Sequence, residues 1–567
     1  MTVANSLRAP WIALLLLLAA LSQPQPLSAE PATGSKGVIA TAHPLATQAG
    51  LAAMERGGNA VDAAVAAALT LGVVDGSNSG IGGGCFLLVR TAAGEIIAID
   101  GRETAPAAAT RDMFLRDGKA DTRLSQVGSL ASGTPGALAA YELALSKHGK
   151  LPLKEHLIAA AKIAEEGFPI NELMVRRLRS EAEDLARFKA SAAIFRKPEG
   201  AAWAKGDILK QPDLAETYRQ IAEHGTGWFY GGAFAEATAK WMSENGGLLA
   251  VEDFRNYRAI VREPVRGTYR GHEVASFPPP SSGGIHVVQI LNMLEPYDLR
   301  SFGAGSANLI HVSTEAMKLA FADRAHWLGD PDFVPVPKQL IAPEYAQSLG
   351  KAIDLEHSTK VTTHGIPENS ATDIFQKHTT HLSSADAEGN WVACTATINT
   401  AFGSKVVVPG TGVLLNNEMD DFSAQPGVPN AFGLVGGEAN AVAPGKRPLS
   451  SMSPTIVLKD GQPMLSVGAA GGPTIITQTL LTIVNTIDFE QDLATAMAAP
   501  RWHHQWLPDE LKIERKVPEE VRAALREKGH TLDETGWFGA TQAVQRLPDG
   551  TFVGLADPRG EGAASAY

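Results

Sequence analysis

The chain has 567 residues, of which 44% are hydrophobic and 19% are charged, as in ordinary globular proteins. Its 49 lysines and arginines against 61 aspartates and glutamates give a net charge of −12, and nothing basic clusters. This argues against nucleic acid as the main partner and leaves a small zwitterionic substrate open. The length predicts either one large sandwich or two subunit-sized parts.

The first 29 residues predict a secretory signal. Arg8 precedes an apolar run over residues 11–21, and small residues lead up to Ala29. Because the run is shorter than the roughly 20 residues of a membrane-spanning helix, we expect cleavage after Ala29, with an uncleaved anchor as the alternative. The protein is then expected to be periplasmic or secreted, with no integral membrane segment after signal removal.

The next stretch is rich in small and apolar residues. Val38 to Ala42 predicts a strand, and residues 47–71 have helical spacing interrupted by Gly57-Gly58-Asn59, which predicts two helices joined by a turn. The second, from Ala60 to Leu71, is apolar on nearly every side and should be a buried layer helix.

A glycine-rich segment, residues 76–84, follows these helices. It lacks the third glycine of a dinucleotide-binding loop, since Cys85 stands there, and it follows a helix instead of a strand. We therefore expect a tight turn near the active site, leading into a strand over 85–90. With Cys394, Cys85 is one of two cysteines, and their apolar or small neighbours predict buried free thiols more than a disulfide.

The strand expected from Ile97 ends near Arg102. A strand ending in arginine can aim a planar cation at a carboxylate, although a surface arginine is the ordinary alternative. Beyond it, residues 140–260 look helical and residues 277–284 form a loop. The helices predicted up to residue 328 are 154–166, 172–187, 211–224, 233–245, 285–296 and 306–328.

Residues 329–378 are rich in Pro, Asp and Ser, and their end marks a boundary between two parts, 30–378 and 379–567. The second part begins with alternating strands and turns and continues with helices at about 473–488 and 490–499. If the bond between His378 and Thr379 is cut, Thr379 gains a free α-amine with a pKa of about 8 beside its hydroxyl. That amine can accept the hydroxyl proton, so the cut creates the catalyst.

Thr-Thr-His at the start of a strand is common in β proteins, but five separated blocks of sequence make the assignment of Thr379 as a nucleophile specific. They are Thr379-Thr380-His381, Thr397-Ile398-Asn399-Thr400, the run 415–422, the run 446–455 and Gly471-Gly472. In this order they resemble the γ-glutamyltranspeptidases (γ-glutamyl transferase/glutathione hydrolase), which are N-terminal-nucleophile hydrolases. The likeness extends upstream through residues 100–106 and downstream to 499–501 and 557–559, so it covers nearly the whole mature chain.

The resemblance implies an α+β fold, a four-layer αββα sandwich built by a large subunit, 30–378, and a small catalytic subunit, 379–567, from one precursor. It also assigns roles to individual residues. Thr379 matches the nucleophile, Thr397 a hydroxyl that orients it, and Gly471 and Gly472 the oxyanion hole. The carboxylate side of the substrate site matches Arg102, Ser450 and Ser451, and the ammonium side matches Asn399, Glu418 and Asp421.

The expected activity is cleavage of the γ-glutamyl amide of glutathione and related compounds through a γ-glutamyl-threonine intermediate, with water, amino acids or dipeptides as acceptors. No cofactor or metal is expected. The nearer alternative is a related acylase acting on glutaryl or cephalosporin side chains, which lack the ammonium and would leave Asp421 buried and unpaired. An exported binding protein with an inactive catalytic core is the alternative from another class.

Two positions depart from many bacterial members of the family. Phe432 stands where several have tyrosine, which removes a hydroxyl from the loop that covers the pocket. Glu418 replaces the glutamine of some members, which adds a negative charge near the ammonium. Other hydrolase classes lack their signatures, since the sequence has no G-x-S-x-G elbow and the adjacent His503-His504 does not provide H-E-x-x-H spacing.

Overall fold

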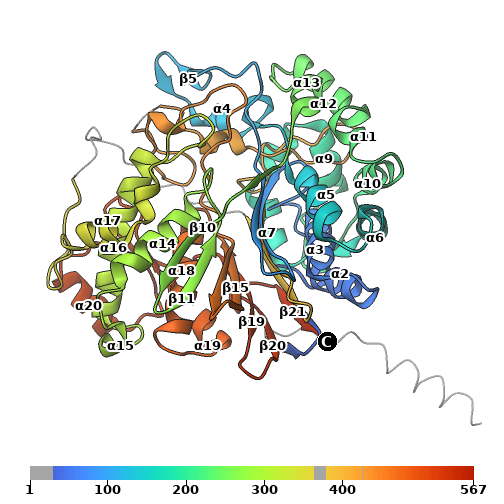
Figure 1. Ribbon diagram of the computed structural model, residues 1–567. Coiled ribbons are helices and arrows are strands. Elements are labelled where there is room, and N and C mark those ends of the chain that lie inside the picture. Colours follow the sequence, from blue (N-terminus) through green and yellow to red (C-terminus); the bar gives the residue numbers. More distant parts are fainter. Residues whose placement is uncertain (1–29, 363–378, 426) are drawn as a thin grey trace, which may run out of the picture.

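The computed structural model describes residues 30–362, 379–425 and 427–567 (Figure 1). Two seven-stranded antiparallel sheets lie at its centre. The first sheet contains, in spatial order, β1 (Ala32–Gly34), β20 (Phe552–Ala556), β19 (Ala540–Arg546), β15 (Gln462–Ala470), β14 (Thr455–Lys459), β11 (His272–Ser276) and β10 (Val265–Tyr269). The second contains β21 (Ala563–Ala566), β2 (Gly37–Thr41), β12 (Thr380–Asp386), β13 (Trp391–Thr397), β3 (Gly84–Arg90), β4 (Ile96–Gly101) and β9 (Ile260–Arg262).

The two sheets pack face to face through a core of large apolar side chains. Phe86 and Trp391 from the second sheet meet Ile456 and Val544 from the first, and all four are buried. The ring of Phe86 stacks on Phe277, with centroids 4.0 Å apart. Such burial of apolar area is the main force that holds sheet on sheet.

Helices cover the outer face of each sheet, on opposite sides in Figure 1. The second sheet is covered by α2 (Pro44–Glu55), α3 (Ala60–Val74) and α5 (Ala137–His148). Outside this layer, α6 (Leu153–Glu166) packs on α3, and α10 (Pro212–His224) packs on α6. The first is covered by α14 (Gly283–Leu294) and α18 (Thr474–Ile487), and α16 (Ala307–Trp327) packs on α14. The order helix, sheet, sheet, helix confirms the predicted αββα sandwich. It also explains why β3 is buried along its whole length, because both of its faces are covered.

Shorter elements complete the fold. The remaining α-helices are α4 (Thr122–Gln126), α7 (Glu172–Ser180), α8 (Ala182–Ala186), α9 (Lys189–Phe195), α11 (Gly227–Tyr230), α12 (Ala233–Glu244), α13 (Val251–Asn256), α15 (Leu299–Phe302), α17 (Pro343–Gly350), α19 (Leu493–Ala498) and α20 (Glu519–Glu527). The small sheets comprise β5 (Leu115–Arg116) with β6 (Lys119–Ala120), β7 (Phe168–Pro169) with β8 (Ile208–Leu209), and β16 (Trp502–His503), β17 (Leu511–Glu514) and β18 (Leu532–Thr535).

Most of the predicted elements are confirmed, including the buried helix α3, which has no exposed residue. The single helix predicted over 172–187 is wrong: it is divided into α7 and α8 at Glu181, whose φ of −99° and ψ of 6° break the helical backbone. The hairpin of β10 and β11 was not predicted. Cys85 and Cys394 are both buried free thiols, as expected.

Both sheets contain strands from before and from after Thr379. In the second sheet β12 pairs with β2 on one side and with β13 on the other, with Leu382 opposite Thr41. In the first sheet β11 pairs with β14, with Val274 opposite Val457. The proposed large and small parts therefore share each sheet.

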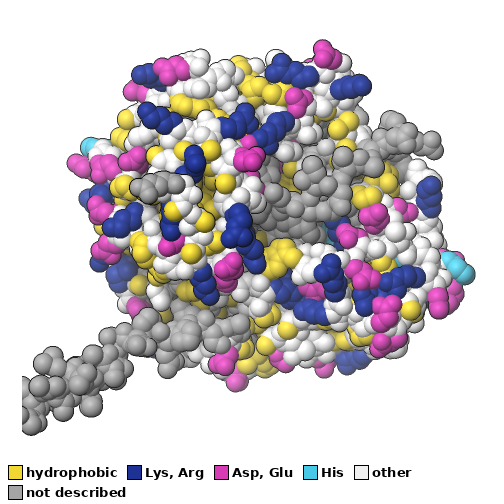
Figure 2. All heavy atoms as spheres, turned by 180° about the vertical axis from the view of Figure 1, so that it is seen from behind, with side chains coloured by type: hydrophobic (Ala, Val, Ile, Leu, Met, Phe, Trp, Pro, Cys, Tyr) yellow, Lys and Arg dark blue, Asp and Glu magenta, His cyan; other side chains and the backbone are white. Residues whose placement is uncertain are grey.

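The surface and the helix lengths bear on possible partners. Figure 2 shows Lys and Arg side chains interspersed with Asp and Glu over the face it displays. Among the residues that the structure describes, none of the helices is both long enough and apolar enough to cross a membrane. The predicted signal, residues 1–29, lies outside the described residues.

Candidate active site

Thr379 immediately precedes the first residue of β12, which is a central strand of the second sheet, and it is 6% exposed. The neighbouring strand β13 ends at Thr397, and the register that pairs Thr380 with Ala396 brings the two strand ends together. Their hydroxyl oxygens, Thr379 Oγ1 and Thr397 Oγ1, are 3.3 Å apart. The sheet thus holds the predicted nucleophile beside a second hydroxyl.

The turn after β13 fixes the orientation of this second hydroxyl. The backbone N–H of Asn399 donates to Thr397 Oγ1 at 2.8 Å. Asn399 has a φ of 77°, a left-handed conformation that asparagine tolerates better than most residues, and its side-chain amide donates to the Asn417 carbonyl at 3.0 Å. Since one lone pair of Thr397 Oγ1 is occupied, its proton can be directed to Thr379.

Arg102 follows directly after β4, and its side chain is buried. It donates to Glu418 Oε1 through Nη1, and to Asp421 Oδ2 through Nη2 at 2.5 Å. Its Nε donates to the Pro448 carbonyl at 3.0 Å. The surface-arginine alternative is therefore wrong, because the chain buries this cation between two acids that are more than 300 residues away in sequence.

Glu418 and Asp421 lie at the two ends of a short 3-10 helix, η4 (Glu418–Asp421). As their spacing predicted, both carboxylates point toward the same cation. Glu103 adds a third carboxyl, with Oε2 3.8 Å from Arg102 Nη1. One guanidinium thus faces three acids.

Burial and the charges of their neighbours shift the pKa values of Arg102 and of the three acids around it. Burial raises the pKa of Glu103 to about 7, and burial likewise raises the pKa values of Glu418 and Asp421. Burial opposes the charge of Arg102, but Glu418 and Asp421 outweigh it and raise the pKa of Arg102. Burial therefore favours the protonated forms of these acids, and a second cation placed among them would favour their charged forms.

Most of these groups, although not Glu103, line one small pocket. Of the described residues predicted for the site, the pocket brings together Thr379, Thr397, Asn399, Arg102, Glu418, Asp421, Ser450, Ser451 and Gly472. Gly471 is the one that does not line it. His378, the other side of the predicted cut, lies outside the described residues.

Gly471 and Gly472 form the turn between β15 and α18. Their φ values are 140° and 57°, and a Cβ on Gly472 would lie 2.8 Å from Phe432 Cδ1. A Cβ on Gly471 would lie 2.6 Å from the Phe538 carbonyl oxygen. Both the backbone conformation and the close packing require glycine here.

The loop around Phe432 covers this turn. Phe432 is 6% exposed, and the side-chain amide of Gln505 donates to the carbonyls of Phe432 at 3.3 Å and Gly433 at 3.1 Å. The amide of Asn430 donates to Asp421 Oδ1 at 3.3 Å. Hydrogen bonds thus connect the loop both to Asp421 in the pocket and to Gln505 in the segment that follows β16.

Sequence reasoning missed two charged groups at the site, Glu103 and Arg324. Glu103 follows Arg102 directly within the segment 100–106 that resembles the family, and this adjacency could have indicated that its carboxyl lies at the site. Arg324 belongs to α16 and donates to Ser451 Oγ at 3.3 Å. Its helical periodicity gives no sign of that contact, because the partner comes from a distant loop.

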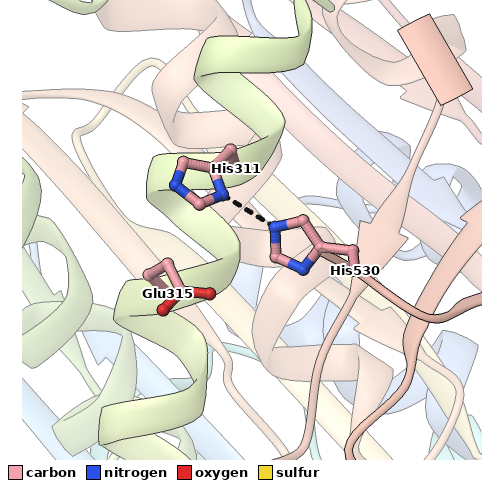
Figure 3. Close-up of side chains that lie close together, drawn as sticks. All are labelled: His311, Glu315 and His530. Carbon is pink, nitrogen blue, oxygen red and sulfur yellow. Dashed lines mark hydrogen bonds between the residues drawn. The ribbon is translucent and has the colours of Figure 1, made fainter. Parts of the chain in front are cut away.

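Another cluster of titratable side chains lies apart from the pocket: His311 and Glu315 on α16, and His530 (Figure 3). His311 Nδ1 and His530 Nε2 are 2.7 Å apart in a hydrogen bond, closer than the roughly 3.3 Å between two nitrogens on one zinc ion. The ammonium of Lys318 lies 2.8 Å from Glu315 Oε1, and His311 Nε2 lies 2.7 Å from the Asp354 carbonyl. These contacts describe a structural cluster that holds the segment at Asp354 to α16.

Comparison with known proteins identifies the family. The model for γ-glutamyltranspeptidase matches residues 46–567. The chain belongs to this family. The glutathione hydrolase proenzyme of Escherichia coli is 47% identical over 532 residues, which cover 93% of this chain and 91% of that protein.

Two solved structures share the fold of this chain. A crystal structure of cephalosporin acylase from Bacillus halodurans superposes with a TM-score of 0.85 at 30% identity, and covers 96% of this chain and 98% of that one. A chain of Helicobacter pylori γ-glutamyltranspeptidase gives a TM-score of 0.55 at 41% identity, and covers 56% of this chain and 91% of that one. The αββα architecture is thus shared with both a transpeptidase and an acylase.

Proposed function

We propose that this γ-glutamyltranspeptidase family member is a γ-glutamyltransferase and glutathione hydrolase. It cleaves the γ-glutamyl amide of glutathione and related compounds and passes the γ-glutamyl group to water, an amino acid or a dipeptide. The observation that carries the proposal is the pocket that places Arg102, Glu418 and Asp421 beside Thr379. The name of the Escherichia coli relative supports it.

The charges of the pocket match those of the donor. A γ-glutamyl group has an α-carboxylate and an α-ammonium on one carbon. Arg102 pairs with Glu418 and Asp421 at one side of the pocket. A bound donor inserts its carboxylate on the arginine side, with Ser450 and Ser451, and its ammonium on the acid side, with Asn399, so that each buried charge keeps an opposite partner.

We propose that maturation is the first use of the nucleophile. Thr379 Oγ1 attacks the carbonyl carbon of His378, the peptide C–N bond breaks, and water hydrolyses the resulting ester to two chains. The products are a large subunit, 30–378, and a small subunit, 379–567. The proenzyme name of the Escherichia coli relative supports this division. So does the Helicobacter pylori chain, which matches little more than half of this chain.

In the mature enzyme the α-amine of Thr379 accepts the hydroxyl proton while Oγ1 attacks the γ-amide carbon. The backbone N–H groups at Gly471 and Gly472 stabilise the oxyanion, and the leaving amine takes the proton. Water or an acceptor amine then attacks the γ-glutamyl ester and restores Thr379. The scheme uses only residues of the chain together with the donor and water or an acceptor. If residues 1–29 act as a signal, the protein is exported to the periplasm or the medium.

The test combines processing with turnover. On a denaturing gel the purified protein should show two bands of roughly 38 and 20 kDa, and it should release nitroaniline from γ-glutamyl-p-nitroanilide. Mass spectrometry should place the new chain start at Thr379. An intact single chain that hydrolyses glutathione at full rate would contradict the proposal.

The covering loop gives a separate prediction for the balance of the two reactions. Phe432→Tyr adds a hydroxyl over the pocket, where a new hydrogen bond of about 0.5–1.5 kcal/mol would hold the loop closed against water. We expect the ratio of transfer to hydrolysis to rise by about threefold to tenfold, measured as γ-glutamyl-glycylglycine against glutamate. Phe432→Leu is the control, and an unchanged ratio in Phe432→Tyr would show that the hydroxyl has no role in closure.

A further inference from the structure

We propose that Arg324 is a positioning residue for donor recognition: it turns the hydroxyl of Ser451 toward the donor α-carboxylate and supplies a second positive charge on that side of the pocket. The proposal rests on the proposed function. It assigns a role to a side chain that does not line the pocket and acts through one that does.

Arg324 lies near the end of α16, in the helical layer beside the first sheet, and is 5% exposed. Its guanidinium donates through Nε to Ser282 Oγ at 3.0 Å and through Nη2 to Ser451 Oγ at 3.3 Å. The buried arginines Arg102 and Arg501 each pair with a carboxylate. Among the salt bridges of the described residues, Arg324 has none. Its direct partners are hydroxyls, and the carboxylate of Asp421 acts on its charge from beyond salt-bridge distance.

A buried cation without a directly paired carboxylate is costly, and an anion bound on its side of the pocket lowers that cost. Burial lowers the pKa of Arg324 to about 10, so the guanidinium is still charged at neutral pH. With Arg102 it provides two positive charges against the carboxyl groups of Glu418, Asp421 and Glu103, the last of which has a pKa of about 7. A zwitterionic donor adds one charge of each sign and so leaves the net charge of this set unchanged.

The direction of the hydrogen bonds makes the inference specific. Arginine can only donate, so the hydroxyl oxygens of Ser282 and Ser451 must accept. Ser282 passes its own proton to the Ser450 carbonyl at 2.8 Å. The hydroxyl of Ser450 in turn accepts from the backbone N–H of Met452 at 3.1 Å.

Ser450 and Ser451 therefore each receive a hydrogen bond from the protein and retain a proton to give. A carboxylate only accepts, so two aligned donors suit it, whereas an ammonium has no lone pair to offer them. The serine pair is set to recognise a carboxylate, and Arg324 is the group that sets Ser451.

The experiment compares inhibitors that differ only in the carboxylate. Inhibition constants of glutamate and of 4-aminobutyrate are measured against γ-glutamyl-p-nitroanilide for the parent and Arg324→Gln. We expect glutamate to bind about tenfold to a hundredfold more weakly in the variant, and 4-aminobutyrate to change by less than about twofold. The KM of the anilide should rise more than its kcat falls. An equal loss for both inhibitors would overturn the proposal.

A double-mutant cycle with Ser451→Ala tests the route of the effect. Because Arg324 acts through Ser451, the double variant should bind glutamate within about threefold of Ser451→Ala alone; fully additive losses would contradict this. If Arg324→Gln does not mature into two chains, Arg324→Met, which also removes the charge and the donors, takes its place in the same comparison. A parent protein that does not turn over the anilide would refute the proposed function itself, which is a distinct outcome.

Discussion

Replacing Thr379 by alanine is expected to leave one uncut chain with no measurable turnover. The change removes the only hydroxyl that the proposed scheme uses for both attacks, while the methyl group fits the space beside Thr397. Loss of a nucleophile that forms the covalent intermediate typically costs at least about a thousandfold in rate. A denaturing gel and release of nitroaniline from the γ-glutamyl anilide measure the two effects separately.

Thr379→Ser is the matched variant, because it retains a hydroxyl and a future α-amine. It should mature, at a reduced rate, and recover part of the turnover. Two bands in the alanine variant, or a new chain start at another residue by mass spectrometry, would contradict the assignment of Thr379. Removal of Thr397 should instead slow both steps without abolishing them, since its contact to Thr379 is a 3.3 Å hydrogen bond.

Asp421→Asn is expected to lower kcat/KM for γ-glutamyl donors by about a hundredfold to a thousandfold. The substitution retains the shape of the side chain but takes away the negative charge that faces both Arg102 Nη2 and the proposed site of the donor ammonium. Glutaryl-p-nitroanilide lacks that ammonium, so its turnover should fall much less or rise. The ratio of the two donors therefore distinguishes a γ-glutamyl enzyme from an acylase of the same fold.

Asp420→Asn provides the control within the same 3-10 helix. Asp420 is buried and accepts from Ser125 Oγ at 2.6 Å and from the Ala431 N–H at 2.9 Å, but it does not line the pocket. Its loss should affect stability without changing the ratio of γ-glutamyl to glutaryl turnover. Equal γ-glutamyl turnover by Asp421→Asn and the parent would show that Asp421 does not recognise the ammonium.

The sequence predicted much of this because two kinds of local pattern are strong. Helices such as α3 repeat small apolar residues without interruption, and the spacing of Glu418 and Asp421 gave their common direction. What was missed depends on long-range contact. The contact of Arg324 with Ser451 joins residues 127 positions apart, and the pairing of Arg102 with Glu418 joins residues 316 apart. The break at Glu181 was missed because α7 and α8 have continuous helical composition.

The pairing of strands from both parts within each sheet has a consequence for the lifetime of the protein. Before the cut, β2 and β12 find each other within one chain; after it, a denatured molecule must reunite two separate polypeptides. Unfolding thus becomes effectively irreversible in dilute solution, and persistence depends on a high barrier to opening instead of on rapid recovery. The two-chain enzyme would therefore form only once, because its own maturation cleaves the peptide bond that keeps the two parts in one chain during folding.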